Sequence, residues 1–250
     1  MVMKHALLGC LIPTLSVTFH AFSAQAEGVE YKASLYGWGI GIETEIETPR
    51  GTIERDIGFD DLFNDLEIAA LGSIEAHTNG VSLLVDVQYF ELETDIDRPL
   101  SAGLVDATAD TKFGVASLYG LYRLYDGLRT KVDLGGGIRH TDLDLGVALS
   151  AGALTSEVFS SSRSATDPLL ALRASHDIAS DWTLSGMIDY GGFGIGTDMT
   201  AQATATLEYD WTKRWSGAFG YRYLTYESTT DFGDITVDYS GPILGLSYTF

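Results

Sequence analysis

Three histidines lie beyond the N-terminal segment of this sequence and are its best candidates for acid–base chemistry: His77, His140 and His176. His140 is followed closely by two carboxylates, at Asp142 and Asp144. A histidine oriented by a carboxylate can act as a base toward a hydroxyl nucleophile. The sequence has no Gly-x-Ser-x-Gly turn, however, and the serines at 160–162 belong to a polar stretch without a catalytic signature. We therefore assign no catalytic residue and expect no enzymatic activity.

Metal and redox chemistry also lack the residues they need. Cys10 is the only cysteine, and it lies in a segment that we expect to be removed, so the mature chain offers no disulfide and no thiolate ligand. Acidic residues are abundant in the stretches between the expected strands, but none follow the spacing of an EF-hand loop. We therefore predict no metal site and no cofactor.

The first 26 residues have the three parts of a secretory signal. A short basic start precedes an apolar stretch over 6–22, and Ala24-Gln25-Ala26 provides an A-x-A cleavage site. Polar residues interrupt the apolar stretch, which is also shorter than the roughly 20 residues of a spanning helix. The pattern predicts a cleavable signal peptide over 1–26 and a single mature domain over 27–250.

Composition limits what the mature domain can be. The 250-residue sequence carries a formal charge of −20, and so acidic a chain repels the phosphates of DNA and RNA, which excludes nucleic acid as a partner. Glycine and tyrosine are frequent and proline is rare, a composition that favours strands and tight turns. Beyond residue 26 no apolar run is long enough for a spanning helix. A chain of this kind can cross a membrane only as strands.

Alternation of apolar and polar residues is the strongest structural signal. Over 81–89, 182–190, 200–211 and 215–223, apolar residues occupy one set of alternate positions and mostly polar or small residues occupy the other. A strand has this pattern when one face meets lipid and the other lines a polar lumen. We therefore predict an all-β fold, a transmembrane antiparallel up-and-down β-barrel.

Turn residues divide the mature domain into ten expected strands. Four short turns at 77–80, 124–127, 176–181 and 210–214 are assigned to the periplasm, because outer-membrane barrels have short periplasmic turns and longer outer loops. Between 44 and 65, Thr52 to Ile57 could extend a hairpin, and Phe59 to Leu66 has the pattern of a short amphipathic helix. Eight or twelve strands are therefore the alternatives to ten. The expected strands are 31–43, 66–77, 81–92, 111–123, 128–140, 166–176, 182–194, 200–210, 214–226 and 236–250.

The end of the chain alternates apolar residues back from a terminal aromatic, at Leu244, Leu246, Tyr248 and Phe250. This segment resembles the C-terminal strand of bacterial outer-membrane proteins, which the barrel-assembly machinery recognises in that superfamily. In pattern, the mature chain resembles the small OmpA/OmpW-like barrels and uncharacterised porin-like barrels of Gram-negative bacteria. The resemblance implies a place in the cell outer membrane, with lipid, lipopolysaccharide and the assembly machinery as partners. We favour a monomer.

Aromatic residues gather near the expected periplasmic turns, where tyrosine and tryptophan mark a water–lipid boundary. These residues are Tyr122, Tyr125, Trp182, Tyr209, Trp211, Trp215, Tyr248 and Phe250. The alternative is a soluble periplasmic lipocalin-like binding barrel, in which the same apolar faces would point inward. Alternation alone does not separate the two, and the boundary aromatics together with the terminal Phe250 favour the membrane.

With the apolar faces outward, charged residues of both signs face the lumen. Charges removed from bulk water need partners, so salt bridges between lumen strands are expected. The expected lumen-lining residues are Glu75, Asp86, Lys131, Asp133, Arg139, Arg173, Asp189, Glu208 and Arg222. The sequence therefore predicts either a narrow porin-like channel for small solutes or a structural or surface barrel whose lumen is filled. A lipid-modifying outer-membrane enzyme, with His140 as its base, is a further alternative.

Overall fold

The computed structural model describes residues 28–48, 51–58, 66–95, 106–151, 154–230 and 233–250. All regular elements in these ranges are strands, so the all-β prediction is confirmed. None of the described residues forms a helix long and apolar enough to span a membrane. The predicted signal peptide lies outside the described residues, as does the predicted helix except for Leu66, which begins a strand.

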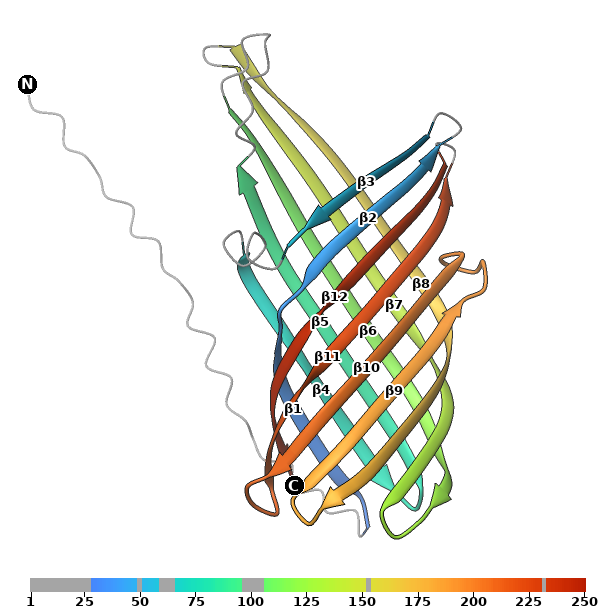
Figure 1. Ribbon diagram of the computed structural model, residues 1–250. Helices are drawn as coiled ribbons and strands as arrows, with labels where there is room; N and C mark the ends of the chain where they lie inside the picture. The colour runs from blue at the N-terminus through green and yellow to red at the C-terminus, as the bar shows by residue number, and fades with distance from the viewer. Residues whose placement is uncertain (1–27, 49–50, 59–65, 96–105, 152–153, 231–232) are drawn as a thin grey trace, which may run out of the picture.

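Twelve strands are found in the described parts of the chain (Figure 1). They are β1 (Glu30–Trp38), β2 (Gly41–Thr48), β3 (Gly51–Ile57), β4 (Leu66–Thr78), β5 (Val81–Asp95), β6 (Asp106–Asp126), β7 (Thr130–Ala151), β8 (Leu154–Ala179), β9 (Trp182–Gly192), β10 (Met199–Asp210), β11 (Trp215–Thr230) and β12 (Gly233–Thr249).

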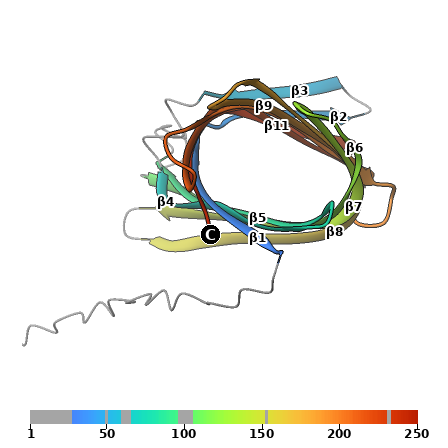
Figure 2. The same cartoon turned by 90° about the horizontal axis from the view of Figure 1, so that it is seen from below.

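Ten of these strands close a barrel. Neighbours pair antiparallel from β4 through β12, and β1 joins the two ends of this series by pairing with both β4 and β12. Seen along its length, the barrel is a closed ring of tilted strands (Figure 2). The predicted ten-stranded up-and-down barrel is therefore confirmed, and the eight-stranded alternative is wrong.

The two remaining strands lengthen the wall at one end. β2 continues β1 against β12 in the same register, with Trp38 opposite Ile243 and Gly41 opposite Ser240. The backbones approach closely at the break between β1 and β2, because a Cβ on Gly241 would lie 1.8 Å from the Gly39 carbonyl oxygen. β3 then pairs with β2, which confirms the additional hairpin strand predicted over 52–57.

Short turns lie at the end of the barrel that also holds the C-terminus (Figure 1). The turn between β4 and β5 has two residues, Asn79 and Gly80, with φ angles of 46° and 78°. Positive φ at both positions is the geometry of a type I′ turn, which matches the twist of two antiparallel strands. By the rule that periplasmic turns are short, this end faces the periplasm.

The outer face of the barrel is apolar and the inner face is charged. Leu35 and Leu244 are 74% and 70% exposed on the outside, whereas Arg139 and Asp189 are 0% and 5% exposed on the inside. A soluble lipocalin-like barrel would have the opposite arrangement, so that alternative is wrong. An exposed apolar wall around a polar interior is the arrangement of a barrel embedded in lipid.

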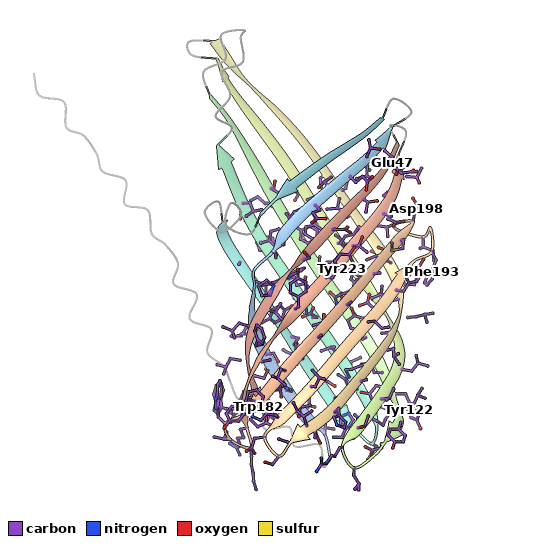
Figure 3. The ribbon with its side chains drawn as sticks, viewed as in Figure 1. Glu47, Tyr122, Trp182, Phe193, Asp198 and Tyr223 are labelled. Atoms are coloured by element: carbon purple, nitrogen blue, oxygen red, sulfur yellow. The ribbon has the colours of Figure 1, made fainter. Side chains whose placement is uncertain are left out.

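Aromatic side chains mark the periplasmic edge of this apolar wall. Trp182 contacts Tyr209 with ring centroids 4.8 Å apart, and Trp215 contacts Tyr248 at 4.8 Å. Figure 3 shows Trp182 and Tyr122 at this edge, while Phe193 and Tyr223 lie farther along the wall toward the opposite end. The apolar surface between these two levels is the membrane belt.

Candidate functional site in the barrel lumen

The periplasmic third of the lumen contains linked ion pairs. Arg173 on β8 contacts Glu75 on β4 and Asp133 on β7, each at 2.9 Å. Asp133 also pairs with Arg123 on β6. Four strands are joined by these contacts. Because each charge has an opposite partner, the cost of removing it from bulk water is offset.

A second pair spans the lumen at the same level. Lys32 on β1 lies 2.7 Å from Glu208 on β10, and the two side chains are 31% and 23% exposed. Solvent therefore reaches this level of the lumen from the periplasmic end. Lys32 is not one of the predicted lumen residues. The period-two alternation does indicate its place, because Lys32 and Ser34 alternate with Tyr31 and Leu35.

Deeper in the barrel, Arg139 forms a fully buried network. Its guanidinium lies 2.9 Å from the Asp189 carboxylate, and both side chains are 0% exposed. The same guanidinium donates to the Tyr119 hydroxyl and the Thr200 hydroxyl, each at 2.9 Å, and to Ser117 at 3.2 Å. Tyr119 in turn donates to Asp189 at 2.8 Å.

A neighbouring network is centred on Arg222 of β11. Arg222 lies 3.3 Å from the Asp86 carboxylate and donates to the Tyr36 hydroxyl at 2.8 Å. Tyr36 donates to Asp86 at 2.6 Å, and Gln88 donates to the other Asp86 oxygen at 2.8 Å. The guanidinium also lies over the Tyr36 and Trp38 rings, at 4.8 and 5.5 Å from their centroids.

Beyond these networks, toward the outer end, the lumen is filled by apolar side chains. Phe113 stacks on Tyr239 with centroids 4.7 Å apart and contacts Phe90 at 4.9 Å. Tyr226 meets both Phe113 and Tyr239 edge to face. We call Phe90, Phe113, Leu224, Tyr226 and Tyr239 the aromatic layer. All five are at most 9% exposed, so they close the lumen at this level.

The aromatic layer has no clear signal in the sequence pattern. Phe90 follows Asp86 and Gln88 on the lumen face of β5, so apolar residues replace polar ones on the same face toward the outer end. Alternation assigns these side chains to the lumen, but it does not bring together residues of β5, β6, β11 and β12. Only closure of the barrel makes them neighbours.

A cavity of about 250 Å³, lined by both polar and apolar side chains, lies on the periplasmic side of the two networks. Its charged lining comprises three cations and three anions: Lys32, Arg173, Arg222, Glu75, Asp86 and Glu208. Hydroxyl and amide groups complete much of the wall, among them Gln202, Thr204 and Thr206 of β10. The cavity therefore has a balanced charge and many hydrogen-bonding groups.

Eight of the nine predicted lumen residues lie inside the barrel within these networks, and Lys131 differs. Lys131 is exposed near the periplasmic end of β7, one residue from the start of that strand. Lys131 alternates in step with Asp133, but it lies too near the end of the wall for the barrel to enclose its side chain.

Three of the predicted assembly-signal residues lie on the outer face of β12, and Phe250 directly follows the last residue of that strand. Leu244, Leu246 and Phe250 are 70%, 43% and 65% exposed, and Tyr248 contacts the Phe250 ring at 5.0 Å. The Phe250 amide donates to the Tyr31 carbonyl at 2.9 Å, close to the seam between β12 and β1. These residues lie on or directly after the strand that closes the barrel.

The three histidines all bond to hydroxyl groups on a neighbouring strand. His140 lies 2.8 Å from the Thr166 hydroxyl, and the corresponding pairs are His77 with Ser82 at 2.9 Å and His176 with Thr130 at 2.7 Å. His140 alone also contacts a carboxylate, Asp142, at 3.1 Å. It is exposed and alternates with the buried Arg139, so it lies on the outer face. Among the described residues, no group of three or more His, Cys, Asp and Glu side chains is arranged for a metal.

The fold can be compared with solved structures. The chain is similar to the outer membrane protease OmpT from Escherichia coli, with a TM-score of 0.55 and 11% identity over 90% of this chain and 98% of that protein. The transport unit of the autotransporter AIDA-I from Escherichia coli matches with a TM-score of 0.42, 10% identity and 94% of each chain. Neisserial surface protein A matches with a TM-score of 0.35, 11% identity, and 90% and 100% coverage. No family model and no curated protein sequence matches this chain.

The closed ten-stranded wall, the apolar belt and the charged interior define the class of this protein. It is an integral β-barrel of the cell outer membrane, with the fold found in Gram-negative outer-membrane proteins. At 11% identity, the likeness to OmpT shows this fold alone.

Proposed function

We propose that this protein is a non-conducting outer-membrane barrel, which acts as a structural or surface protein and not as a pore. The observation that carries the proposal is the closure of the lumen by buried side chains. Arg139 and Leu224 are both 0% exposed, and Tyr119 and Phe113 are 1% and 2% exposed. A conducting path needs continuous water, and these side chains leave none at their level.

Ring size supports the proposal. An eight-stranded barrel is just wide enough for its own side chains to fill the interior, and ten strands widen it only slightly. Arginine and aromatic side chains are large enough to fill the additional width. The charged networks then stabilise the closed wall by linking strands that are not adjacent.

The strands that reach beyond the belt support a role at the cell surface. β6, β7 and β8 have 21, 22 and 26 residues, well beyond the roughly 9–11 that cross a bilayer. Figure 1 shows these strands and the β2–β3 hairpin projecting from the end opposite the C-terminus. These projections are the parts that we expect to meet partners outside the cell.

Planar-bilayer recording tests the closed lumen. The mature protein should insert and remain electrically silent, with its insertion checked by the shift in gel migration that a folded barrel shows on boiling. Reproducible single-channel steps that change in an Arg222→Ala variant would contradict the proposal. They would support the second candidate, a narrow channel, which the cavity on the periplasmic side favours.

Surface labelling tests the orientation. A mature chain that begins after residue 26 has no cysteine, so single cysteines can be introduced at Thr52 in β3 and at Leu128 in a short turn. Both positions are exposed. On intact cells, an impermeant maleimide should label Thr52→Cys and leave Leu128→Cys unlabelled until the outer membrane is opened. The reverse pattern would contradict the proposal.

The proposal includes the absence of catalysis. The contact of His140 with Thr166 has counterparts at the other two histidines, which makes it a common cross-strand pair and not a special arrangement. The backbone amides near His140 belong to the paired β7–β8 ladder, which leaves no evident donors for an oxyanion. Expression of the wild type and of His140→Ala should give the same acylation of lipid A and phospholipids. If expression of the wild type changes this acylation and expression of His140→Ala does not, the protein is an enzyme and this part of the proposal is wrong.

A further inference from the structure

Six side chains around the middle of the lumen each have a buried polar atom without a hydrogen-bond partner among the described residues. These atoms are Trp38 Nε1, Gln88 Oε1, Asp189 Oδ1, Gln202 Oε1, Thr204 Oγ1 and Arg222 Nε. An unpaired buried polar group costs about 1–3 kcal/mol, so native proteins seldom leave several together. A cluster of this size indicates that something else supplies the missing hydrogen bonds.

Three of these side chains line the cavity directly. Gln202, Thr204 and Arg222 belong to its wall, and Gln202 and Arg222 are 6% and 7% exposed. The other three lie behind this wall and each contacts a wall residue, which for Gln88 is Asp86. Gln202 donates to Asp189 at 3.4 Å, and Arg222 covers the Trp38 ring. Three of the unpaired atoms therefore belong to residues of the cavity wall, and the other three lie behind that wall.

The cavity is reached from the periplasm. At the periplasmic mouth of the cavity, side chains are partly exposed: 31% for Lys32, 20% for Glu75 and 23% for Glu208. Beyond its inner end, the side chains of Arg139 and Asp189 are 0% exposed. The aromatic layer closes the lumen on the far side. A molecule that enters from the periplasm would thus stop beside Gln202, Thr204 and Arg222.

The charges of the cavity favour a neutral ligand. Its three cations already pair with its three anions, as Lys32 with Glu208, Arg173 with Glu75, and Arg222 with Asp86. A charged ligand would have to break one of these pairs, and leaving a buried charge unpaired is costly. A neutral ligand leaves these pairs intact and can hydrogen-bond to the hydroxyl and amide groups of the wall.

The unpaired atoms also define the hydrogen bonding of the ligand. Of the three that belong to wall residues, Gln202 Oε1 can only accept, Arg222 Nε can only donate, and the Thr204 hydroxyl can do both. Hydroxyl groups serve both roles, so a polyhydroxylated molecule complements this set. The volume of about 250 Å³ is slightly below the roughly 300–1,000 Å³ of drug-sized pockets, which suits a monosaccharide-sized solute.

We propose that the periplasmic cavity binds a small, neutral, polyhydroxylated solute of monosaccharide size, held by Gln202, Thr204 and Arg222. This binding goes beyond the proposed function, because it requires no conduction. The two proposals can fail separately. A barrel that conducts no ions but fails to bind the solute contradicts only the binding proposal, and a barrel that binds the solute but conducts ions contradicts only the proposed function.

Calorimetric titration of the full mature chain with methyl α-glucoside tests the proposal, in an amine-oxide detergent that carries no sugar. Saturable binding in the millimolar range is expected. Sodium acetate and methylammonium chloride, as small charged probes, should neither bind nor compete. Binding of a charged probe in place of the glucoside would overturn the proposal. An absence of saturable binding would also overturn it, because the cavity would then hold water only.

Variants locate the site. Thr204→Val keeps the side-chain shape and removes one unpaired hydroxyl, so it should weaken binding about tenfold. Thr236→Val makes the same change on the outer face of β12 and should leave binding unaltered. Gln202→Leu should abolish detectable binding, and the gel shift on boiling verifies that each variant is folded. Equal binding by all three variants would contradict the assignment.

Fluorescence gives an independent readout. Trp38 is 7% exposed beside the cavity, whereas Trp182, Trp211 and Trp215 are 39–58% exposed at the periplasmic edge of the belt. The glucoside should change the emission of the wild type, and this change should disappear in Trp38→Phe. Persistence of the full change in that variant would place the binding elsewhere and refute the proposal.

Discussion

Arg139 on β7 and Asp189 on β9 form an ion pair at 2.9 Å although β8 lies between their strands in the barrel wall. Neither side chain is exposed to solvent. The pair therefore bridges non-adjacent strands through the lumen, and Tyr119 from a third strand bonds to both partners. Backbone pairing links each strand only to its neighbours, so such contacts set the shape of the barrel cross-section.

Replacing Arg139 by alanine should destabilise the barrel strongly, because it leaves the Asp189 carboxylate buried without a counter-charge. Loss of one partner of a buried pair costs about 3–5 kcal/mol. Urea unfolding of the protein in lipid vesicles measures the free energy of unfolding. Lys213→Ala, a change in an exposed turn, is the control and should alter it by less than about 0.5 kcal/mol.

The paired replacement Arg139→Met with Asp189→Leu separates charge from packing. Apolar residues of similar size often replace a buried ion pair at little cost. The double variant should therefore be more stable than Arg139→Ala alone. If it is equally destabilised, packing around Arg139, and not the unpaired carboxylate, explains the loss.

A charge on the outer face should be tolerated at the edge of the belt and not at its centre. Val85 is 40% exposed on the outer face of β5, four residues after its start, while Leu128 is fully exposed in a short periplasmic turn. Arginine at the bilayer midplane costs roughly 2–4 kcal/mol, against about 0–1 near the interface. Val85→Arg should therefore lower the free energy of unfolding by that larger amount in vesicles, and Leu128→Arg should not. Equal effects would place the belt elsewhere.

The turn between β4 and β5 depends on a backbone conformation that favours glycine. Gly80 has a φ of 78°, and a Cβ there would also lie 3.3 Å from the Arg123 Cβ. Gly80→Ala should destabilise the barrel by about 1 kcal/mol, because alanine is strained at positive φ. Gly37→Ala on β1 is the matched control, since nothing lies within 4 Å of its added Cβ. Urea midpoints of the two variants compare them directly, and equal midpoints would show that the turn does not need glycine.

Strand positions and wall faces could be predicted from the sequence because each strand carries its own period-two pattern. Val81 to Tyr89 shows its two faces without reference to any other strand. The contacts across the lumen could not be predicted in this way. Lys32 and Glu208 are separated by 176 residues, and their meeting depends on the register of every strand between them. Closure and shear of the barrel, which no single segment encodes, bring them together.

The filling of the lumen by apolar side chains could not be predicted from the sequence, for a related reason. Phe113 and Tyr239 lie 126 residues apart in the sequence (239 − 113), and each strand alone shows only an apolar residue on its inner face. Their rings stack because β5 and β6 face β11 and β12 across the closed barrel. Sequence alternation assigns inner and outer faces, but it does not say whether the inner faces touch.

Phe250 should be needed for efficient assembly more than for the stability of the finished barrel. Its ring is 65% exposed on the outer face, so its removal breaks few buried contacts, chiefly the edge contact with Tyr248 at 5.0 Å. Phe250→Ser should reduce the amount of folded protein in the outer membrane severalfold. The free energy of unfolding of the protein that does fold should fall by less than about 1 kcal/mol. Quantifying the heat-shifted band in membrane fractions measures assembly, and urea unfolding measures stability. Ile195→Ser removes a comparably exposed apolar side chain, 73% exposed in the β9–β10 connection, and should leave assembly unchanged. If both variants assemble equally well, the terminal aromatic is only part of the membrane belt and does not act as a recognition signal.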